Sequence, residues 1–255
     1  MTRAAPDVLD SAETHVGLVR SGNQDGYCCN SAAGIWAVAD GMGGHHGGER
    51  ASAAIIEAIE NVPEHSSFAQ RLSAARIAIA EANRIIFDEA DLSGRRMGTT
   101  IVALVAGEGR YAILWAGDSR AYLKRGDSFH SLTRDHTQAE ELVSAGMLEP
   151  GAVAGHPSSH ILVRAIGVLS SVDLDQVDGQ IADNDIFLLC SDGLYNLVSD
   201  AEMVKMIDVY EFDRVSEHLV ELCLERGAPD NITVCLASMG SQNSALNISF
   251  GSFDQ

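Results

Sequence analysis

Apolar and polar residues alternate along the chain with two different periods, which predict a mixture of strands and helices. After a polar leader, residues 14–29 and 34–40 are rich in β-forming side chains, with a turn-forming segment between them. Residues 49–62 and 67–90 carry isoleucine, leucine and phenylalanine three and four positions apart, the spacing of amphipathic helices. Two consecutive helices of this kind need a common apolar surface to cover.

The second half of the chain repeats this order of elements. Residues 98–133 contain β-rich segments joined by glycine-containing links, which predicts an antiparallel meander. Two more strands are expected at 172–181 and 185–192, a pair of helices between about 200 and 226, and a last strand at 231–238. This order predicts an α+β fold of antiparallel sheets with paired helices packed outside.

Two segments fall outside this pattern. Residues 138–160 begin with a helical pattern and then become rich in Gly, Pro, Ser and His, which indicates a surface excursion. Residues 241–255 form a polar tail of low charge. Since no linker or internal repeat interrupts the rest, we expect one domain over residues 1–240.

Composition narrows the classes of function. The chain has 255 residues, of which 36 are acidic and 17 basic, for a formal net charge of −19. No block of lysine and arginine offers a surface for nucleic-acid phosphates, so nucleic acid is not an expected partner. Acidic residues can serve solubility alone, but a cluster of carboxylates in so acidic a chain would require a cation, which makes a divalent metal worth seeking.

The cysteines and the first residues of the chain suggest the cellular compartment of the protein. Five cysteines occur without paired spacing, which favours reduced thiols in a cytosolic protein. The first residues lack the apolar core of a signal peptide, and no run approaches the ~18 apolar residues that cross a bilayer. We therefore expect a soluble, cytoplasmic protein without a membrane partner.

Aspartates recur at the ends of apolar segments. IWAVAD ends at Asp40, AILWAGD at Asp118 and IFLLCSD at Asp192, while Asp230 precedes NITVCLA. Each acid also stands in good turn sequence, so that any one of them alone could be a turn residue. Antiparallel strands can bring one strand's end and another's start to the same edge, where converging carboxylates would bind hard cations such as Mg²⁺ or Mn²⁺.

A carboxylate site with two metals suits phosphoryl chemistry. Two metals lower the pKa of a bound water and hold the oxygens of a phosphoryl group during in-line displacement. The phosphate's remaining oxygens then need a cation, and Arg20 is a candidate because a guanidinium can bind two of them at once. The alternative for Arg20 is a solvated strand position.

Eight segments together resemble the type 2C protein phosphatases, the metal-dependent serine/threonine phosphatase (PPM) family. They span roughly residues 14 to 237 in the order and approximate spacing of that family: VRSGNQD, VADGMGGHHGGERAS, MGTT, AGDSRAY, LTRDHT, LVRAIG, LLCSDGLYN and PDNITV. The resemblance implies a four-layer αββα sandwich, with two antiparallel sheets flanked by paired helices and the metal site at one end.

The resemblance also implies roles for individual residues. Asp40 matches the aspartate that bridges two Mn²⁺ or Mg²⁺ ions, and the carbonyl of Gly41 matches a backbone ligand. Asp192 and Asp230 match ligands of the other metal, and Asp118, with Asp192, matches a weaker third site of bacterial members.

Further roles concern the substrate and the partners. Arg20 matches the phosphate clamp, Asp25 matches an acid that holds metal-bound water, and residues 138–160 match a flap that influences substrate choice. The Gly-Met-Gly-Gly loop and compact length resemble the bacterial branch, whose members usually oppose serine/threonine kinases. The resemblance thus implies hydrolysis of phosphoserine and phosphothreonine by a monomer whose partners are a kinase or its targets.

Two residues depart from the family pattern. Gln24 stands where many members have glutamate, so one metal is expected to be held less tightly. Met42 stands where animal members carry a histidine proposed as general acid, which leaves the acid for the leaving group open. His45 and His46 are alternatives, although adjacent histidines do not easily point into one small site, and protonation by metal-bound water is as plausible.

Other interpretations of the glycine loop are less favoured. Cysteines or further ligands with zinc spacing do not accompany the histidines. A nucleotide-binding loop would require Gly-Lys-Ser/Thr or a Rossmann turn, and neither occurs here. The alternative from another class is an inactive relative that binds phosphoproteins, but such a relative is expected to have lost metal aspartates.

Overall fold

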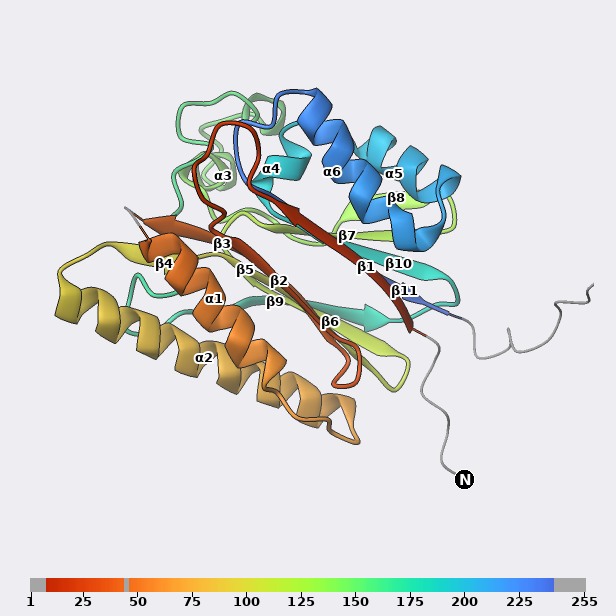
Figure 1. The fold of residues 1–255 in the computed structure, drawn as a ribbon, viewed down its shortest axis with the longest axis horizontal. Coiled ribbons are helices and arrows are strands. Elements are labelled where there is room, and N and C mark those ends of the chain that lie inside the picture. Colours follow the sequence, from red (N-terminus) through yellow and green to blue (C-terminus); the bar gives the residue numbers. More distant parts are fainter. Residues whose placement is uncertain (1–7, 44–45, 241–255) are drawn as a thin grey trace, which may run out of the picture.

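The computed structural model describes residues 8–43 and 46–240 and shows two antiparallel sheets packed face to face (Figure 1). One sheet has the strand order β1-β11-β10-β7-β8, with bounds Val8–His15, Ile232–Met239, Asp185–Cys190, Arg120–Arg125 and Ser128–Ser131. The other has the order β2-β3-β5-β6-β9, with bounds Asp25–Asn30, Ile35–Gly43, Ile101–Gly107, Arg110–Ala116 and Asp175–Gln180. A short strand, β4 (Met97–Thr99), pairs with the end of β3.

Helices cover the outer face of each sheet, and this confirms the predicted αββα sandwich. The long pair α1 (Gly47–Glu60) and α2 (Phe68–Ser93) packs on the β2–β9 sheet. The other sheet carries α4 (Asp192–Tyr195), α5 (Asp200–Val209) and α6 (Val215–Glu225), with a 3₁₀ turn at Phe212–Arg214. No helix among the described residues has the length and apolar character needed to cross a membrane.

Three apolar layers hold the sandwich together because central strands bury both faces. In β3, Ile35 and Ala37 face α1 and α2, while Trp36 and Val38 face the opposite sheet. Phe187 and Leu189 of β10 fill the same inter-sheet layer, and Leu188 faces the helices on the other side. This alternation explains why these strands read as continuous hydrophobic runs.

Two strand predictions were wrong. The first strand was expected at residues 14–29, yet β1 begins at Val8, and residues 16–24 form a loop. The predicted meander over 98–133 divides between sheets, since β5 and β6 belong to one and β7 and β8 to the other. The chain changes sheet at Gly117, which has φ +114°, and a Cβ there would lie 2.6 Å from the Thr100 side chain.

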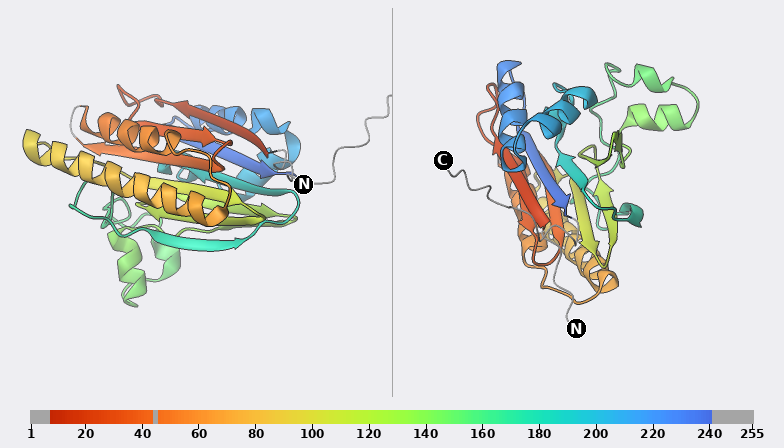
Figure 2. Two further views of the ribbon diagram at one scale, coloured as in Figure 1. Left: turned by 90° about the horizontal axis from the view of Figure 1, so that it is seen from below. Right: turned by 90° about the vertical axis from the view of Figure 1, so that its right-hand side faces the viewer.

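The predicted excursion projects from the body of the molecule (Figure 2). It contains α3 (Gln138–Ser144), capped by the Thr137 side chain, and a 3₁₀ turn at Pro150–Ala152. The chain re-enters the body through an antiparallel bridge between Thr137 and Leu162. We call residues 138–160 the flap.

Candidate active site

One end of the sandwich is hollowed into a cleft of about 1260 Å³. Its wall contains every predicted metal ligand and the predicted phosphate clamp: Arg20, Asp40, Gly41, Asp118, Asp192 and Asp230. The structure thus brings together residues separated by up to 210 positions in the sequence. Asp25, the remaining predicted site residue, is not part of the wall.

Both sheets contribute to this end of the molecule. Asp40 lies on β3 of the β2–β9 sheet, and Asp118 lies in the crossover between β6 and β7, where the chain passes from that sheet to the other. Asp192 begins α4 two residues after β10, and Asp230 lies two residues before β11, so both come from the other sheet. The aspartates therefore meet where the ends of the two sheets come together.

Short backbone contacts hold the aspartates in place. The Asp40 amide donates to Thr100 Oγ1 (2.9 Å), and the Thr100 amide donates to the Asp40 carbonyl (2.8 Å). Thr100 Oγ1 also contacts Ser119 Oγ at 2.6 Å, beside Asp118. At Gly193 an added Cβ would lie 1.9 Å from the Asn231 carbonyl oxygen, so glycine allows the Asp192 and Asp230 segments to touch.

Asp25 lies directly opposite Asp40 in the register of β2 and β3. Its Oδ2 accepts a hydrogen bond from Ser191 Oγ (2.7 Å), which ties it to the neighbouring sheet. Desolvation raises the pKa of Asp25 to about 7 despite that hydrogen bond. Desolvation, followed by the charge of Asp25 and the other aspartates, also raises the pKa of Asp40 well above its usual range.

The same causes act on the other acids. Desolvation and the charge of Asp192 raise the pKa of Asp118 to about 7. Desolvation and the charge of Asp230 raise the pKa of Asp192 to about 6. Carboxylates that disfavour one another's ionisation in this way are matched to a multivalent cation, and oxygen donors are the ligands that Mg²⁺ and Mn²⁺ prefer.

The side chains themselves are engaged with protein partners. Arg20 Nε and Nη2 donate to Asp230 Oδ1 and Oδ2 (2.8 and 2.7 Å), and Asn196 Nδ2 donates to Asp192 Oδ2 (3.2 Å). In this arrangement the described residues contain no group of three His, Cys, Asp or Glu side chains set to hold a metal ion. The oxygen donors of these side chains fit a divalent metal.

Asn231 organises the loop that carries Arg20. Its Oδ1 accepts from the Gln24 amide (2.8 Å), and its Nδ2 donates to the carbonyls of Val16 (2.8 Å) and Gly22 (3.1 Å). This side chain therefore fixes both ends of the loop. The pKa of Arg20 is raised, chiefly by its hydrogen bonds to Asp230, so the guanidinium is permanently charged.

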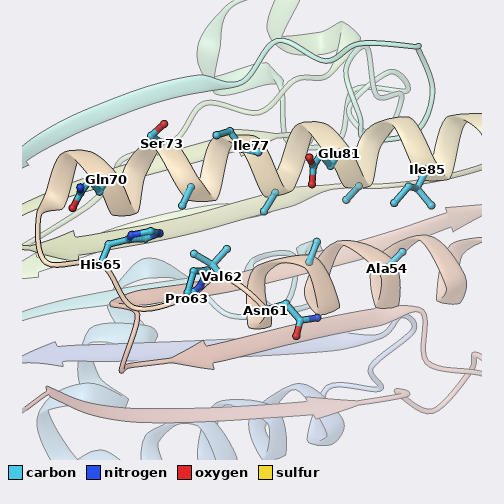
Figure 3. A pocket seen from close by; sticks show the side chains of 14 residues that line it. Ala54, Asn61, Val62, Pro63, His65, Gln70, Ser73, Ile77, Glu81 and Ile85 are labelled. Carbon is cyan, nitrogen blue, oxygen red and sulfur yellow. The ribbon is translucent and has the colours of Figure 1, made fainter.

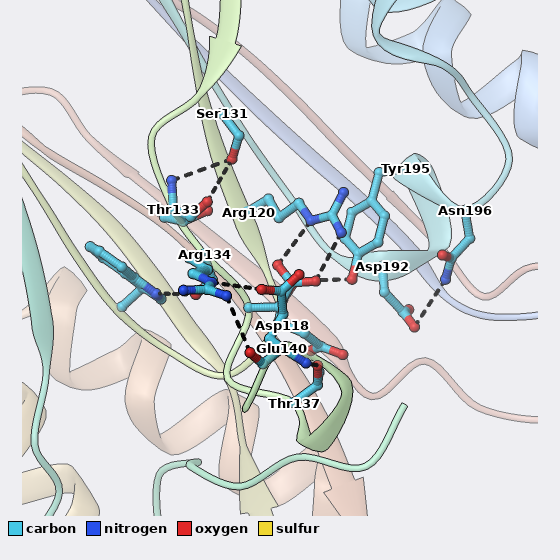
Figure 4. A network of polar contacts seen from close by, with 12 residues as sticks. Asp118, Arg120, Ser131, Thr133, Arg134, Thr137, Glu140, Asp192, Tyr195 and Asn196 are labelled. Atoms are coloured by element: carbon cyan, nitrogen blue, oxygen red, sulfur yellow. Dashed lines mark hydrogen bonds and ion pairs between the residues drawn. The ribbon is translucent and has the colours of Figure 1, made fainter. Parts of the chain in front are cut away.

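A polar network behind the cleft supports Asp118 (Figure 4). Tyr195 Oη donates to the Asp118 carbonyl (3.0 Å), and the Arg120 guanidinium lies 3.6 Å from the centroid of the Tyr195 ring. Arg120 in turn donates from Nε and Nη2 to the two oxygens of Asp135 (2.9 and 2.8 Å). Tyr195 and Asp135 lie within segments that the sequence singled out, but their roles depend on contacts between separate strands.

Histidines and Met42 complete the wall. Met42 lines the cleft, as does His46, whose Nδ1 lies 3.1 Å from Glu49 Oε2. His45 lies outside the described residues. His160, at the end of the flap, also lines the cleft and was not singled out from the sequence, because its flap position carried no recognisable spacing.

A second cavity, of about 620 Å³, lies between α1 and α2 (Figure 3). Alanines and the side chains of Val62, Ile77 and Ile85 dominate its lining. It contains one acidic side chain, Glu81, and so lacks the converging carboxylates of the cleft. The cleft at the sandwich end is therefore the candidate active site.

Comparison with known proteins gives consistent matches. The protein phosphatase 2C family model matches residues 19–233. Serine/threonine protein phosphatase PstP of Mycobacterium tuberculosis is 34% identical over 244 residues, covering 94% of this chain but 46% of PstP, so this chain spans less than half of that relative.

Solved structures are similar over nearly all of the chain. The structure of PppA from Pseudomonas aeruginosa has a TM-score of 0.83 and 36% identity, covering 90% of this chain and 96% of that one. The catalytic domain of PstP, in complex with two manganese ions, has a TM-score of 0.80 and 31% identity, covering 92% and 99%. With its fold, its family match and these relatives in agreement, this chain belongs to the protein phosphatase 2C family.

Proposed function

We propose that this chain hydrolyses phosphoserine and phosphothreonine in phosphoproteins with the help of two Mn²⁺ or Mg²⁺ ions. The observation that carries the proposal is the convergence of Asp40, Asp118, Asp192 and Asp230 with Arg20 in one cleft. Relatives that are named serine/threonine phosphatases, one of them solved with two manganese ions, support it.

The metal ligands that we propose come from both sheets. Asp40 and the Gly41 carbonyl, together with Asp192 and Asp230, would hold two ions, and Asp118 with Asp192 would hold a weaker third. Bound there, the ions would activate a water and neutralise charge on the phosphoryl group. Asp25, opposite Asp40, would orient the attacking water.

Arg20 is proposed as the phosphate clamp. Its guanidinium already makes a two-pronged contact with one oxyanion group, the Asp230 carboxylate, from an exposed loop. A phosphate presents the same pair of oxygens, so Arg20 can exchange one partner for the other. The exchange would release Asp230 for metal binding as substrate arrives.

The cellular setting is part of the proposal. We propose a cytoplasmic monomer that opposes a serine/threonine kinase, and the five free cysteines are compatible with a reducing compartment. The inactive phosphoprotein-binding relative is less favoured, since the four aspartates proposed as metal ligands, Asp40, Asp118, Asp192 and Asp230, all line the cleft.

Hydrolysis of p-nitrophenyl phosphate and of a phosphothreonine peptide tests the proposal. Turnover should require Mn²⁺, cease in excess chelator and be lost in Asp192→Asn. Asp127→Asn, in the β7–β8 turn away from the cleft, is the matched control and should retain full activity. Turnover that persists in excess chelator would contradict the metal-dependent mechanism, and binding of the phosphopeptide without turnover would favour the inactive relative.

A further inference from the structure

The last residue of the flap, His160, lies at the cleft, and its imidazole ring makes no hydrogen bond or ion pair with the described residues. His160 lines the cleft together with Arg20 and Asp192. Within residues 8–43 and 46–240, the His160 side chain makes no hydrogen bond or ion pair. His46, the other histidine of the wall, contacts Glu49 instead.

Backbone contacts fix the point at which His160 enters the cleft. The Gln138 amide donates to the carbonyl of Ile161 (2.9 Å), and the Val163 amide donates to the carbonyl of His136 (2.9 Å). Ile166 exchanges two backbone hydrogen bonds with Thr99, next to the segment that binds Asp40. Residue 160 is therefore held at the cleft even though it is the last residue of the flap.

The proposed hydrolysis needs a proton donor in the cleft, beside the oxygen that leaves phosphorus. A serine or threonine alkoxide is a poor leaving group and benefits from protonation as its bond to phosphorus breaks, and Met42 at the cleft wall cannot supply a proton. We propose, on the basis of the function proposed above, that His160 is the general acid for the leaving serine or threonine oxygen.

Hydrolysis with His160 as the general acid conserves atoms and charge. Water oxygen bonds to phosphorus, the bond from phosphorus to the side-chain oxygen breaks, and its electron pair stays on that oxygen. The His160 imidazolium gives that oxygen a proton, and the attacking water releases one proton to solvent. The imidazole then regains a proton from solvent, which leaves an alcohol and hydrogen phosphate.

Leaving-group dependence tests the assignment. His160→Asn should lower kcat/KM for a phosphothreonine peptide on the order of 100-fold, the lower end of general-acid effects, and leave p-nitrophenyl phosphate nearly unchanged. The p-nitrophenolate leaving group of that substrate is stable without a proton. A series of aryl phosphates with increasingly basic phenols should show a progressively larger loss, which loss of peptide binding would not produce.

His156→Asn is the matched control on the same flap. His156 is outside the cleft wall, and its Nδ1 accepts from the Ser158 amide (3.1 Å), a contact that an asparagine side chain can replace. Both rates should stay unchanged in this variant. An equal loss on all esters in His160→Asn, or no loss on the peptide, would overturn the assignment, whereas a wild-type protein without chelator-sensitive turnover would instead refute the proposed function.

Discussion

Asp25 and Asp40 face each other directly across the antiparallel register of β2 and β3, and Asp40 lines the cleft. Like charges directly opposite on neighbouring strands destabilise a sheet. The fold nevertheless keeps this pair, and it adds Asp118, Asp192 and Asp230 at the same end. Repulsion between these carboxylates lowers the stability of the fold, and such a loss is expected where the carboxylates serve to bind a cation.

The first prediction concerns stability against pH in excess chelator. Asp25 and Asp118 have pKa values of about 7 in the folded protein, against 3.8 in the unfolded chain. Between these values the folded state binds more protons, so stability is highest near pH 4 and is lost as pH rises to about 7. Since one unit of pKa is worth about 1.4 kcal/mol, we expect a loss of at least about 2 kcal/mol over this window.

Urea denaturation at a series of pH values measures this loss. Saturating Mn²⁺ should reduce it, because the cation stabilises the ionised carboxylates in the folded state alone. Asp25→Asn in chelator should make the loss of stability smaller, with the contribution of Asp118 remaining. A wild-type profile that is flat, or that rises from pH 4 to pH 7, would show that these carboxylates are not desolvated as the structure indicates.

The second prediction separates the clamp from the metal site. Arg20→Ala should lower kcat/KM by about 10- to 100-fold, the value of a charged hydrogen-bonded contact, because the phosphate loses its guanidinium partner. Mn²⁺ affinity should not fall, since Asp230 loses its ion pair with Arg20.

Calorimetric Mn²⁺ titration and steady-state kinetics test both parts. Arg84→Ala, which removes an exposed ion pair to Asp88 on α2, is the control. Equal kcat/KM in wild type and Arg20→Ala would remove Arg20 from the site, and a large drop in Mn²⁺ affinity would give it a structural role instead.

The third prediction concerns the network behind Asp118. Arg120→Lys loses the two-pronged contact with Asp135, whose side chain is 10% exposed, and the stacking on Tyr195. We expect a loss of about 2 kcal/mol, since partly buried charges are left poorly paired. Arg134→Lys alters the more exposed pair with Glu140 and should change stability by less than about 0.5 kcal/mol. Equal unfolding midpoints for the two variants would mean that the Arg120–Asp135 pair contributes no more to stability than the more exposed Arg134–Glu140 pair.

Strongly apolar segments made most of the fold predictable. The helices at 49–62 and 67–90 were recognisable because large apolar side chains recur three and four positions apart, and the strand around Trp36 because it is a continuous apolar run. β1 was missed because its one fully buried position holds a polar residue, Ser11, which is hydrogen-bonded to Ser216 Oγ. Hydrophobicity along the chain cannot report such a contact, since its partner lies 205 residues away.

The candidate site was also predictable only in part. The aspartates could be selected because each follows or precedes a buried run, and the cleft contains all of the predicted ligands. The ion pair of Arg20 with Asp230 and the position of His160 could not be predicted, because both depend on how loops fold back over the sheet ends. Metal binding by each residue stays a prediction.

The last prediction concerns the glycines after Asp40. A Cβ on Gly48, at the start of α1, would lie 2.7 Å from the carbonyl carbon and oxygen of Gly41, which is a proposed metal ligand. Helix propensity alone would make Gly48→Ala stabilising by up to about 1 kcal/mol. The contact should reverse that sign, because two backbone segments would have to separate, and we expect a loss of about 2 kcal/mol.

Because the displaced group is Gly41, Gly48→Ala should also weaken Mn²⁺ binding and lower turnover. Gly151→Ala in the flap, where a Cβ meets no atom within 4 Å, is the control and should change neither property. Urea denaturation and Mn²⁺ titration of the two variants decide the point. If Gly48→Ala were more stable than wild type and bound Mn²⁺ equally well, helix propensity would outweigh the contact, and the glycines would not be required for close passage of the loop against α1.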